Sequence, residues 1–396
     1  MRDESRPPKV VLFANTDWYL YNFRLSLIRR LRDDGCDVVL ISPPGDYGEK
    51  LQALGFRWIA LPMQRRSLNP FREAGLVNHI ARLLRDERAD LIHGFTIKPA
   101  VYGGLAGRRA GVRARVSAVA GLGWVFINSS VKARALRPVV ATLLRLALGG
   151  DGARLILQNP DDEALFAQAR LIDPKCVRVI KGSGVDCNRF TPPGASNDAP
   201  GSDDPPLRVL VAARLLWDKG LQEYVDAARA LKALGRNIRF LLAGDPDPGN
   251  PAAVPVETIK AWSDEGLIEW LGHVSDMPAL FHSVDVVALP SYREGLPKSM
   301  IEAGACARAL ITTDAPGCRE VVADGVDGLL VPVKDAAALA GAIARLDDDR
   351  ALLQRLGEAA RKRALSDFDE EIVLAATVAV YRELLGDAAA VGRTAS

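Results

Sequence analysis

Residues 285–332 read DVVALPSYREGLPKSMIEAGACARALITTDAPGCREVVADGVDGLLVP. The apolar run at residues 286–289 predicts a buried parallel strand, and Pro290 and Ser291 end this strand in a short polar loop. A helix is expected from Pro297 onward, because proline suits the first turn of a helix. The stretch therefore predicts one strand, loop and helix of a parallel α/β sheet, with the loop at the carboxyl end of the strand.

Two glutamates frame this loop. Glu294 lies on the loop and Glu302 on the first two turns of the helix, both near backbone amides that have no partner within the helix. Gly295 lets the backbone approach a ligand closely. Amides and the positive end of the helix dipole attract an anionic group, whereas carboxylates accept hydrogen bonds from sugar hydroxyls. The pattern indicates a site for a hydroxylated anion, and the alternative is an ordinary loop with two solvated glutamates.

Four motifs follow one another in this stretch: PSYREGLP, the second glutamate, PGCRE and DGVDGLLVP. Their order resembles the donor-binding half of the family-four retaining glycosyltransferases, which have the GT-B fold. The resemblance implies two doubly wound, Rossmann-like α/β domains facing across a cleft, with a C-terminal helix that crosses back to the first domain. It also implies that Glu294 contacts the donor sugar and Glu302 the ribose of the nucleotide.

Apolar runs alternate with helical patterns along the 396 residues, which is typical of parallel α/β domains. We expect a first, acceptor-side domain at 1–190, a linker rich in Pro, Gly, Ser and Asp at 191–206, a second, nucleotide-sugar-binding domain at 207–368, and a crossover helix and tail at 369–396. Strands are expected at residues 10–14, 38–41, 58–61, 91–92, 116–119, 155–157, 209–212, 240–243, 268–271, 286–289, 310–312 and 329–331.

Two cations follow the first strand of the second domain. Arg214 and Lys219 lie in AARLLWDKG, and either is a solvated surface charge or a ligand for an anion. The resemblance implies that they bind the donor diphosphate, and fixed cations stabilise the charge that a departing nucleoside diphosphate gains. The donor-binding residues that complete this expected set are Val274, Gly295, Leu296, Pro297 and Lys298.

No metal or other cofactor is expected. Asp245 and Asp247 match the D-x-D pattern with which other glycosyltransferases hold a divalent cation, but they follow a strand within a proline-rich turn. Because Arg214 and Lys219 can stabilise the leaving group, a metal ion is unnecessary for this chemistry.

His93 ends the expected strand at 91–92, in ADLIHGFTIKP. This segment resembles the place where a family histidine approaches the donor sugar, which implies a catalytic role, although histidines at such positions are often structural. Many family members carry a glycine-rich loop after the first strand, where this chain has NTDWYLYNFR. The segment NTDWYLYNFR resembles the corresponding sequence of bacterial transferases that extend lipid-linked oligosaccharides, including those that add N-acetylgalactosamine to an undecaprenyl diphosphate sugar. The residues expected on the acceptor side are Asn15, Tyr19, Arg24 and Lys98.

Charge is distributed unevenly along the chain, although the net charge is only +2. Residues 1–150 hold 24 Lys and Arg against 12 Asp and Glu, a balance of +12, and the remainder holds 27 against 37, a balance of −10. Residues 130–150, SVKARALRPVVATLLRLALGG, predict either a helix in an anionic membrane surface or a core helix on the first sheet. No export signal is visible, so we expect a cytoplasmic protein, peripheral on the inner face of the cytoplasmic membrane, with no nucleic acid partner.

These observations predict a retaining glycosyltransferase. It would move an N-acetylhexosamine or hexose from a nucleotide diphosphate sugar, preferably UDP-linked, to a lipid-linked saccharide in bacterial polysaccharide synthesis. One alternative is a nucleotide-sugar 2-epimerase of the same fold, which carries a serine and paired glycines where this chain has APGCRE. The other is a non-catalytic nucleotide-sugar-binding protein, which would be expected to lack the charged residues. Absence of G-x-G-x-x-G after the first strands argues against a dinucleotide oxidoreductase.

Overall fold

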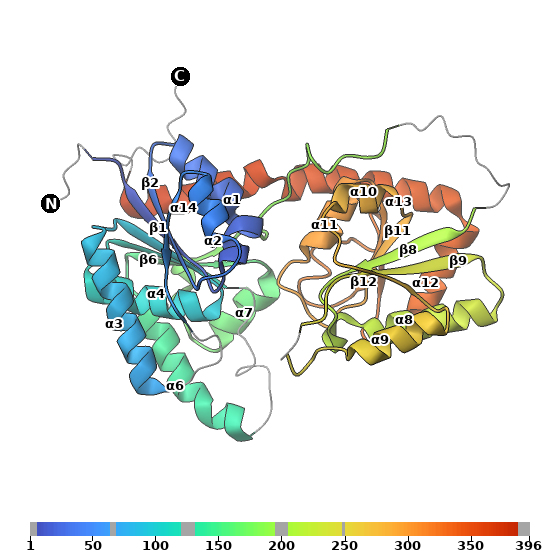
Figure 1. Ribbon diagram of the computed structural model, residues 1–396, viewed down its shortest axis with the longest axis horizontal. Coiled ribbons are helices and arrows are strands. Elements are labelled where there is room, and N and C mark those ends of the chain that lie inside the picture. Colours follow the sequence, from blue (N-terminus) through green and yellow to red (C-terminus); the bar gives the residue numbers. More distant parts are fainter. Residues whose placement is uncertain (1–5, 64–68, 120–130, 195–204, 248–249, 387–396) are drawn as a thin grey trace. The chain divides into compact units, whose positions relative to one another are not determined.

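The computed structural model describes residues 6–63, 69–119, 131–194, 205–247 and 250–386 (Figure 1). The chain divides into two compact units, one formed by residues 1–183 with 371–396 and the other by residues 184–370. Each unit is built on a parallel sheet, as alternating strand and helix patterns predict.

The described part of the first unit contains a seven-stranded sheet in the order β3-β2-β1-β4-β5-β6-β7. Its strands are β1 (Lys9–Phe13), β2 (Asp37–Ser42), β3 (Arg57–Ala60), β4 (Leu91–Phe95), β5 (Ala114–Ala118), β6 (Ala153–Leu157) and β7 (Val177–Val179). The apolar runs predicted the first six. The edge strand β7 was missed, because Arg178 interrupts its two valines and the three residues give no recognisable period. β4 extends to Phe95, so His93 lies inside the strand and not at its end.

Helices cover both faces of this sheet (Figure 1). They are α1 (Asp17–Asp33), α2 (Gly48–Ala53), α3 (Pro70–Asp86), α4 (Ile97–Ala110), α6 (Val131–Leu148), α7 (Pro160–Gln168) and α14 (Glu370–Leu385), with a 3₁₀ turn at Pro174–Cys176. Side chains of α1 and α14 pack with Val10 and Leu12 on one face, and those of α3 and α4 pack with Val11 and Phe13 on the other. The alternation of side chains along β1 thus supplies two cores.

The last helix, α14, belongs to the first unit, although its sequence follows the second. Val373, Val378 and Tyr381 are buried in the core that α1 forms with the sheet. This confirms the predicted crossing of the C-terminal helix. Residues 184–190, which we assigned to the first domain, belong to the second unit, where Val185 lies in a core cluster. Residues 195–204 of the predicted linker and the tail from 387 lie outside the described residues.

In the described part of the second unit, six parallel strands take the order β10-β9-β8-β11-β12-β13. They are β8 (Leu207–Ala212), β9 (Ile238–Ala243), β10 (Glu269–Gly272), β11 (Val286–Leu289), β12 (Ala309–Thr313) and β13 (Leu329–Val331), all predicted within a few residues. The helices are α8 (Leu221–Ala233), α9 (Val256–Asp264), α10 (Met277–His282), α11 (Lys298–Ala305), α12 (Ala336–Asp348) and α13 (Arg350–Arg363), with a 3₁₀ turn at Trp217–Lys219 and a π-helix at Ala364–Phe368.

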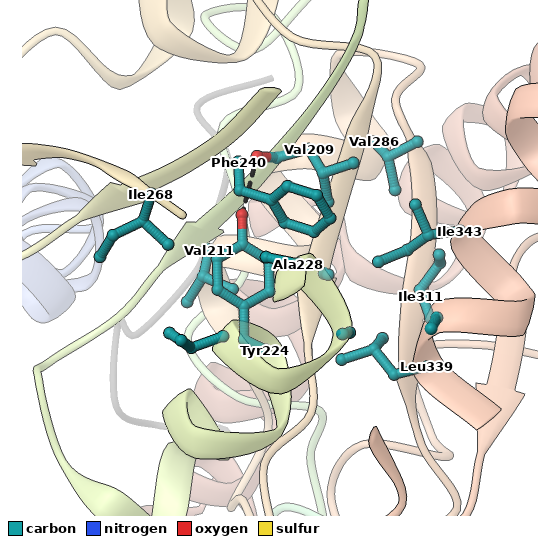
Figure 2. Close-up of a cluster of buried hydrophobic side chains, with 14 of the residues drawn as sticks. Val209, Val211, Tyr224, Ala228, Phe240, Ile268, Val286, Ile311, Leu339 and Ile343 are labelled. Atoms are coloured by element: carbon teal, nitrogen blue, oxygen red, sulfur yellow. Dashed lines mark hydrogen bonds between the residues drawn. The ribbon is translucent and has the colours of Figure 1, made fainter. Parts of the chain in front are cut away.

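Figure 2 shows the larger core of this unit, where Tyr224 of α8 lies among side chains of the sheet and α12. The buried Tyr224 hydroxyl donates to the carbonyls of Val209, at 2.8 Å, and Leu241, at 3.0 Å. A buried hydroxyl needs such partners, because its desolvation would otherwise cost free energy. The core therefore holds α8 firmly against β8 and β9.

Candidate functional site

Two neighbouring loops build the candidate site of the second unit. β8 and β11 pair in parallel, so the loops at their carboxyl ends leave the same edge of the sheet. The β8 loop carries Arg214 and Lys219, and the β11 loop carries Glu294. Ligands of doubly wound domains bind at this edge. The structure therefore brings together residues that the sequence predicted separately.

Lys219 and Glu294 form the central ion pair of this site. Lys219 Nζ lies 2.5 Å from Glu294 Oε1, and each side chain is only 13% exposed. Partial exclusion from water strengthens the attraction between the two charges. Lys219, predicted to bind a diphosphate, and Glu294, predicted to bind a sugar, are therefore in direct contact.

The two aspartates of the D-x-D pattern each contact a nitrogen atom of another side chain. Asp247 Oδ2 lies 3.1 Å from the guanidinium of Arg214, and it also accepts a hydrogen bond of 3.0 Å from Asn250. Asp245 Oδ2 lies 3.1 Å from Nδ1 of His273. Within the described ranges, no three His, Cys, Asp or Glu side chains gather in a way that suits a metal ion. The aspartates thus act as partners of nearby side chains, and Arg214 keeps 62% of its side chain exposed.

Glu302 lies on the second turn of α11, whose first residue is Lys298. Burial raises the pKa of Glu302, and the positive charges of Lys298 and Arg189 oppose this rise. Lys298 Nζ lies 3.7 Å from Glu302 Oε1. Pro297 occupies the cap position of α11 and offers no side-chain hydrogen bond to the first amides. Glu302 thus lies on the first two turns of the helix, where the sequence analysis expects it, and its contact with the ribose stays a prediction.

The PGCRE segment supports the loop that carries Glu294. The amide of Glu294 donates to the carbonyl of Pro316 at 2.9 Å. Gly317 has φ +82°, and a Cβ there would lie 2.2 Å from the carbonyl oxygen of Glu294. Only glycine permits this approach without a backbone shift. Nearby Cys318 is buried, which raises the pKa of its thiol to about 11, so the thiol stays neutral.

The remaining predicted donor-side residues lie around the same core. Val274 and Leu296 are partly buried and pack against the cluster that contains Leu289 and Met300. Gly295 connects Glu294 to Leu296 on the loop before α11. The residues predicted for the donor side thus lie on or next to β11, α11 and the β8 loop, with Val274 following β10.

In the first unit, three predicted residues gather around Phe95. His93 Nδ1 lies 2.6 Å from the hydroxyl of Tyr381. Burial and the nearby charge of Arg24 lower the pKa of His93 well below its usual value, so the ring is neutral. Arg24 lies 4.4 Å above the Phe95 ring and donates a 2.9 Å hydrogen bond to the Tyr19 hydroxyl. The catalytic role of His93 stays a prediction.

The other two residues predicted for the acceptor side are Lys98 and Asn15. Lys98 Nζ forms an ion pair with Glu73 at 3.0 Å, and Asn15 is half-buried after β1. The sequence analysis did not identify Phe95 or Tyr381. The sequence signals at these positions are an aromatic residue at a strand end and a tyrosine in the crossover helix.

Comparisons with known proteins match both units. The family described as "Glycosyl transferases group 1" matches residues 195–363, and the family described as "Glycosyl transferase 4-like" matches residues 9–159. The N,N'-diacetylbacillosaminyl-diphospho-undecaprenol alpha-1,3-N-acetylgalactosaminyltransferase of Campylobacter jejuni is 31% identical over 373 residues, which are 92% of this chain and 96% of the relative. The UDP-Gal:alpha-D-GlcNAc-diphosphoundecaprenol alpha-1,3-galactosyltransferase of Escherichia coli is 25% identical over 74% of this chain and 75% of its own.

Solved structures match the fold over nearly the whole chain. A glycosyltransferase from Rickettsia africae has a TM-score of 0.76 at 21% identity and covers 96% of this chain and 99% of its own. An Anabaena protein in complex with UDP has a TM-score of 0.75 at 20% identity, with 95% and 100% covered. At this identity the likeness shows the fold alone, and it confirms the predicted GT-B class.

Proposed function

We propose a reaction for this chain from the premise that it belongs to the group 1 glycosyltransferases and has a first domain of the glycosyltransferase 4-like kind. The chain transfers a sugar from a nucleotide diphosphate sugar to a saccharide carried on undecaprenyl diphosphate. Support comes from the Campylobacter and Escherichia relatives, whose names both specify diphospho-undecaprenol sugars as acceptors. The Escherichia name specifies a UDP-sugar, which favours a uridine donor here.

The observation that carries this proposal is the Lys219–Glu294 pair, with Arg214 on the same loop as Lys219. In the proposed reaction, the bond between the anomeric carbon and the diphosphate oxygen breaks, and Lys219 and Arg214 stabilise the developing charge. Glu294 orients the sugar and Glu302 accepts a hydrogen bond from the ribose. The acceptor hydroxyl attacks from the face that the diphosphate leaves, and the departing phosphate takes its proton, so configuration is retained.

We propose that this reaction needs no metal ion. Arg214 and Lys219 are the cations at the β8 edge, and both D-x-D aspartates already contact Arg214 or His273. Transfer should therefore continue at the same rate after dialysis against a chelator. A loss of turnover that manganese or magnesium restores would instead assign a metal to Asp245 and Asp247.

We further propose that the enzyme works in the cytoplasm against the anionic inner membrane surface, where such an acceptor is displayed. The described part of α6 buries Leu144 and Leu148 in the first unit and exposes Val139, Leu143 and Leu146 along one stripe. The predicted core packing is therefore present, and an exposed apolar face remains. No helix in the described part of the chain is long and apolar enough to cross a membrane. Surface binding through this stripe and the basic residues of the first unit fits these features.

The proposal is tested by measuring release of nucleoside diphosphate from a panel of UDP- and GDP-sugars, with undecaprenyl diphosphate-linked saccharides as acceptors. We expect one donor to be consumed only with acceptor present, and an α-linked donor to give an α-linked product by NMR. An inverted product would contradict retention. Isomerisation of the donor at C2 without transfer would instead identify a 2-epimerase.

A further inference from the structure

The loops that carry Lys219 and Glu294 are joined by backbone contacts next to these residues. The amide of Tyr292 donates to the carbonyl of Asp218 at 2.9 Å, and the Ser291 hydroxyl donates to the same carbonyl at 3.1 Å. Asp218 directly precedes Lys219, and Tyr292 lies two residues before Glu294. These contacts therefore fix the distance between the two loops at which Lys219 and Glu294 form their ion pair.

Gly220 allows this close approach. It has φ +72°, and a Cβ at this position would lie 2.0 Å from the carbonyl oxygen of Pro290. Gly220 is also the residue from which α8 starts, directly after Lys219. The first turn of α8 is thus packed against the exit of β11, without a side chain between the two backbones.

Tyr292 makes a second connection through its side chain. Its hydroxyl donates a 2.7 Å hydrogen bond to Oε1 of Glu223, the third residue of α8. Tyr292 thus contacts the chain on both sides of Lys219: its amide meets Asp218 and its phenol meets Glu223. The ammonium of Lys334, which follows β13, lies 5.0 Å from the centre of the Tyr292 ring.

The phenol of Tyr292 is protonated at neutral pH and can donate this hydrogen bond. Burial, and then the hydrogen bond to Glu223, raise the pKa of Tyr292 above its usual value, so the phenol remains a donor. The second oxygen of Glu223, Oε2, is buried and accepts no hydrogen bond from the described residues. A buried carboxylate oxygen without a partner costs free energy. A role in holding Tyr292 accounts for retaining a carboxylate there.

We infer that Tyr292 and Glu223 are positioning residues, which together hold Lys219 against Glu294 for the departing diphosphate. The inference rests on the proposed function, because it explains how Lys219, the cation proposed to stabilise the departing diphosphate, is held in position. Neither residue needs to touch the donor. Small displacements of a catalytic group are costly, since a shift of about 1 Å can lower a rate by about a hundredfold.

The test uses the whole chain with the donor that the panel experiment selects, and measures kcat, the donor KM and the melting temperature. Tyr292→Phe removes one oxygen and should lower kcat by about tenfold, with a smaller change in the donor KM, because the lost alignment matters most as the diphosphate leaves. Glu223→Ala should give a similar loss. Glu223→Gln keeps an acceptor oxygen for the phenol and should restore most of the activity.

The double variant Tyr292→Phe with Glu223→Ala tests whether the two residues act as a pair. Its loss should equal that of either single variant, because each removes the same hydrogen bond. Tyr224→Phe is the matched control: this neighbouring phenol is buried in the core (Figure 2), where it bonds to Val209 and Leu241. It should lower the melting temperature and leave kcat unchanged.

The outcomes separate this inference from the proposed function. An unchanged kcat in Tyr292→Phe, or losses that multiply in the double variant, would overturn the positioning role while the wild-type transferase stands. The positioning role would also be overturned if the fall in kcat of Tyr292→Phe were explained by a lower melting temperature, as is expected for a variant of the core. If the wild-type enzyme releases no nucleoside diphosphate from any donor, the proposed function fails and the inference fails with it.

Discussion

At the scale of single residues, Lys219 carries the strongest chemical expectation. Its ammonium contacts Glu294 at 2.5 Å on the edge where the donor is proposed to bind. Lys219→Ala removes a cation that stabilises the leaving group, so the activation barrier should rise by about 2 to 4 kcal/mol while the fold persists. Turnover at saturating donor and the melting temperature would be measured beside Lys260→Ala, an exposed lysine of α9. Equal turnover by both variants would remove Lys219 from the reaction.

Glu302 gives a prediction that links stability to pH. Burial raises the pKa of Glu302 above its ordinary value of 4.5, so the folded state keeps the proton over a pH range in which the unfolded state has lost it. Stability is therefore lost as pH rises through this range. Glu302→Gln should melt at a higher temperature than the wild type at pH 8, and this advantage should disappear below about pH 4.

The same variant should bind donor more weakly, because the glutamine replaces the carboxylate proposed to accept the ribose hydroxyl. Thermal unfolding across pH and a donor titration at pH 8 would be measured on one preparation. A lower melting temperature at pH 8 would show that the pairs with Lys298 and Arg189 outweigh burial. Unchanged donor affinity would remove the ribose role.

At the scale of elements, the β11 loop depends on the PGCRE segment that supports it. Gly317 and Gly325 both have φ between +70° and +82°, so alanine should cost about 1 to 2 kcal/mol at either position. Only at Gly317 would the Cβ also meet the Glu294 carbonyl, at 2.2 Å, because nothing lies within 4 Å at Gly325. Gly317→Ala should therefore displace Glu294 and reduce transfer, whereas Gly325→Ala should only lower stability.

Urea unfolding and donor turnover distinguish these two effects. We expect Gly317→Ala to destabilise the fold at least as much as Gly325→Ala does. Only Gly317→Ala should also lower kcat. Equal kcat in both variants, at matched folded fractions, would mean that the contact between Gly317 and Glu294 does not place the carboxylate.

At the scale of the whole molecule, the uneven charge of the chain predicts where it binds. Residues 1–150 carry a balance of +12 and the remainder −10. An anionic membrane contributes about 1 kcal/mol for each basic residue near its surface. Reversal of Lys132, Arg134 and Arg137 to glutamate should therefore abolish binding to anionic vesicles and slow transfer to the lipid-linked acceptor. The side chains of Lys132 and Arg134 lie outside the described residues.

Vesicle co-sedimentation over a series of salt concentrations checks this expectation. Reversal of Lys260, Arg355 and Lys362, which are exposed in the second unit, changes the net charge equally and is the control. A short water-soluble acceptor should be used normally by both variants. Equal binding of the wild-type enzyme to neutral and anionic vesicles at every salt concentration would refute the electrostatic argument.

The sequence by itself determined most of the elements, and it placed the residues predicted for the donor side on particular loops and helices. The apolar runs placed twelve strands, and α14 (Glu370–Leu385) lies within the segment predicted for the crossover helix and tail at 369–396. Glu294 and Glu302 were placed on a loop and a helix because strand and helix periods and proline positions are local signals. Such signals depend only on residues that are neighbours in the sequence, so they can be read without knowledge of the fold. Edge strand β7 was too short to give one.

The tertiary structure alone decided which residues touch. Lys219 meets Glu294 across 75 positions of sequence, and His93 meets Tyr381 across 288. Both contacts follow from strand order and from the return of α14 to the first unit, and no local period encodes either. His93 looked like the end of a strand because the glycine after it interrupts the apolar run, yet pairing with β5 continues through Phe95. Hydrogen bonds to neighbouring strands, and not the local pattern, set where a strand ends.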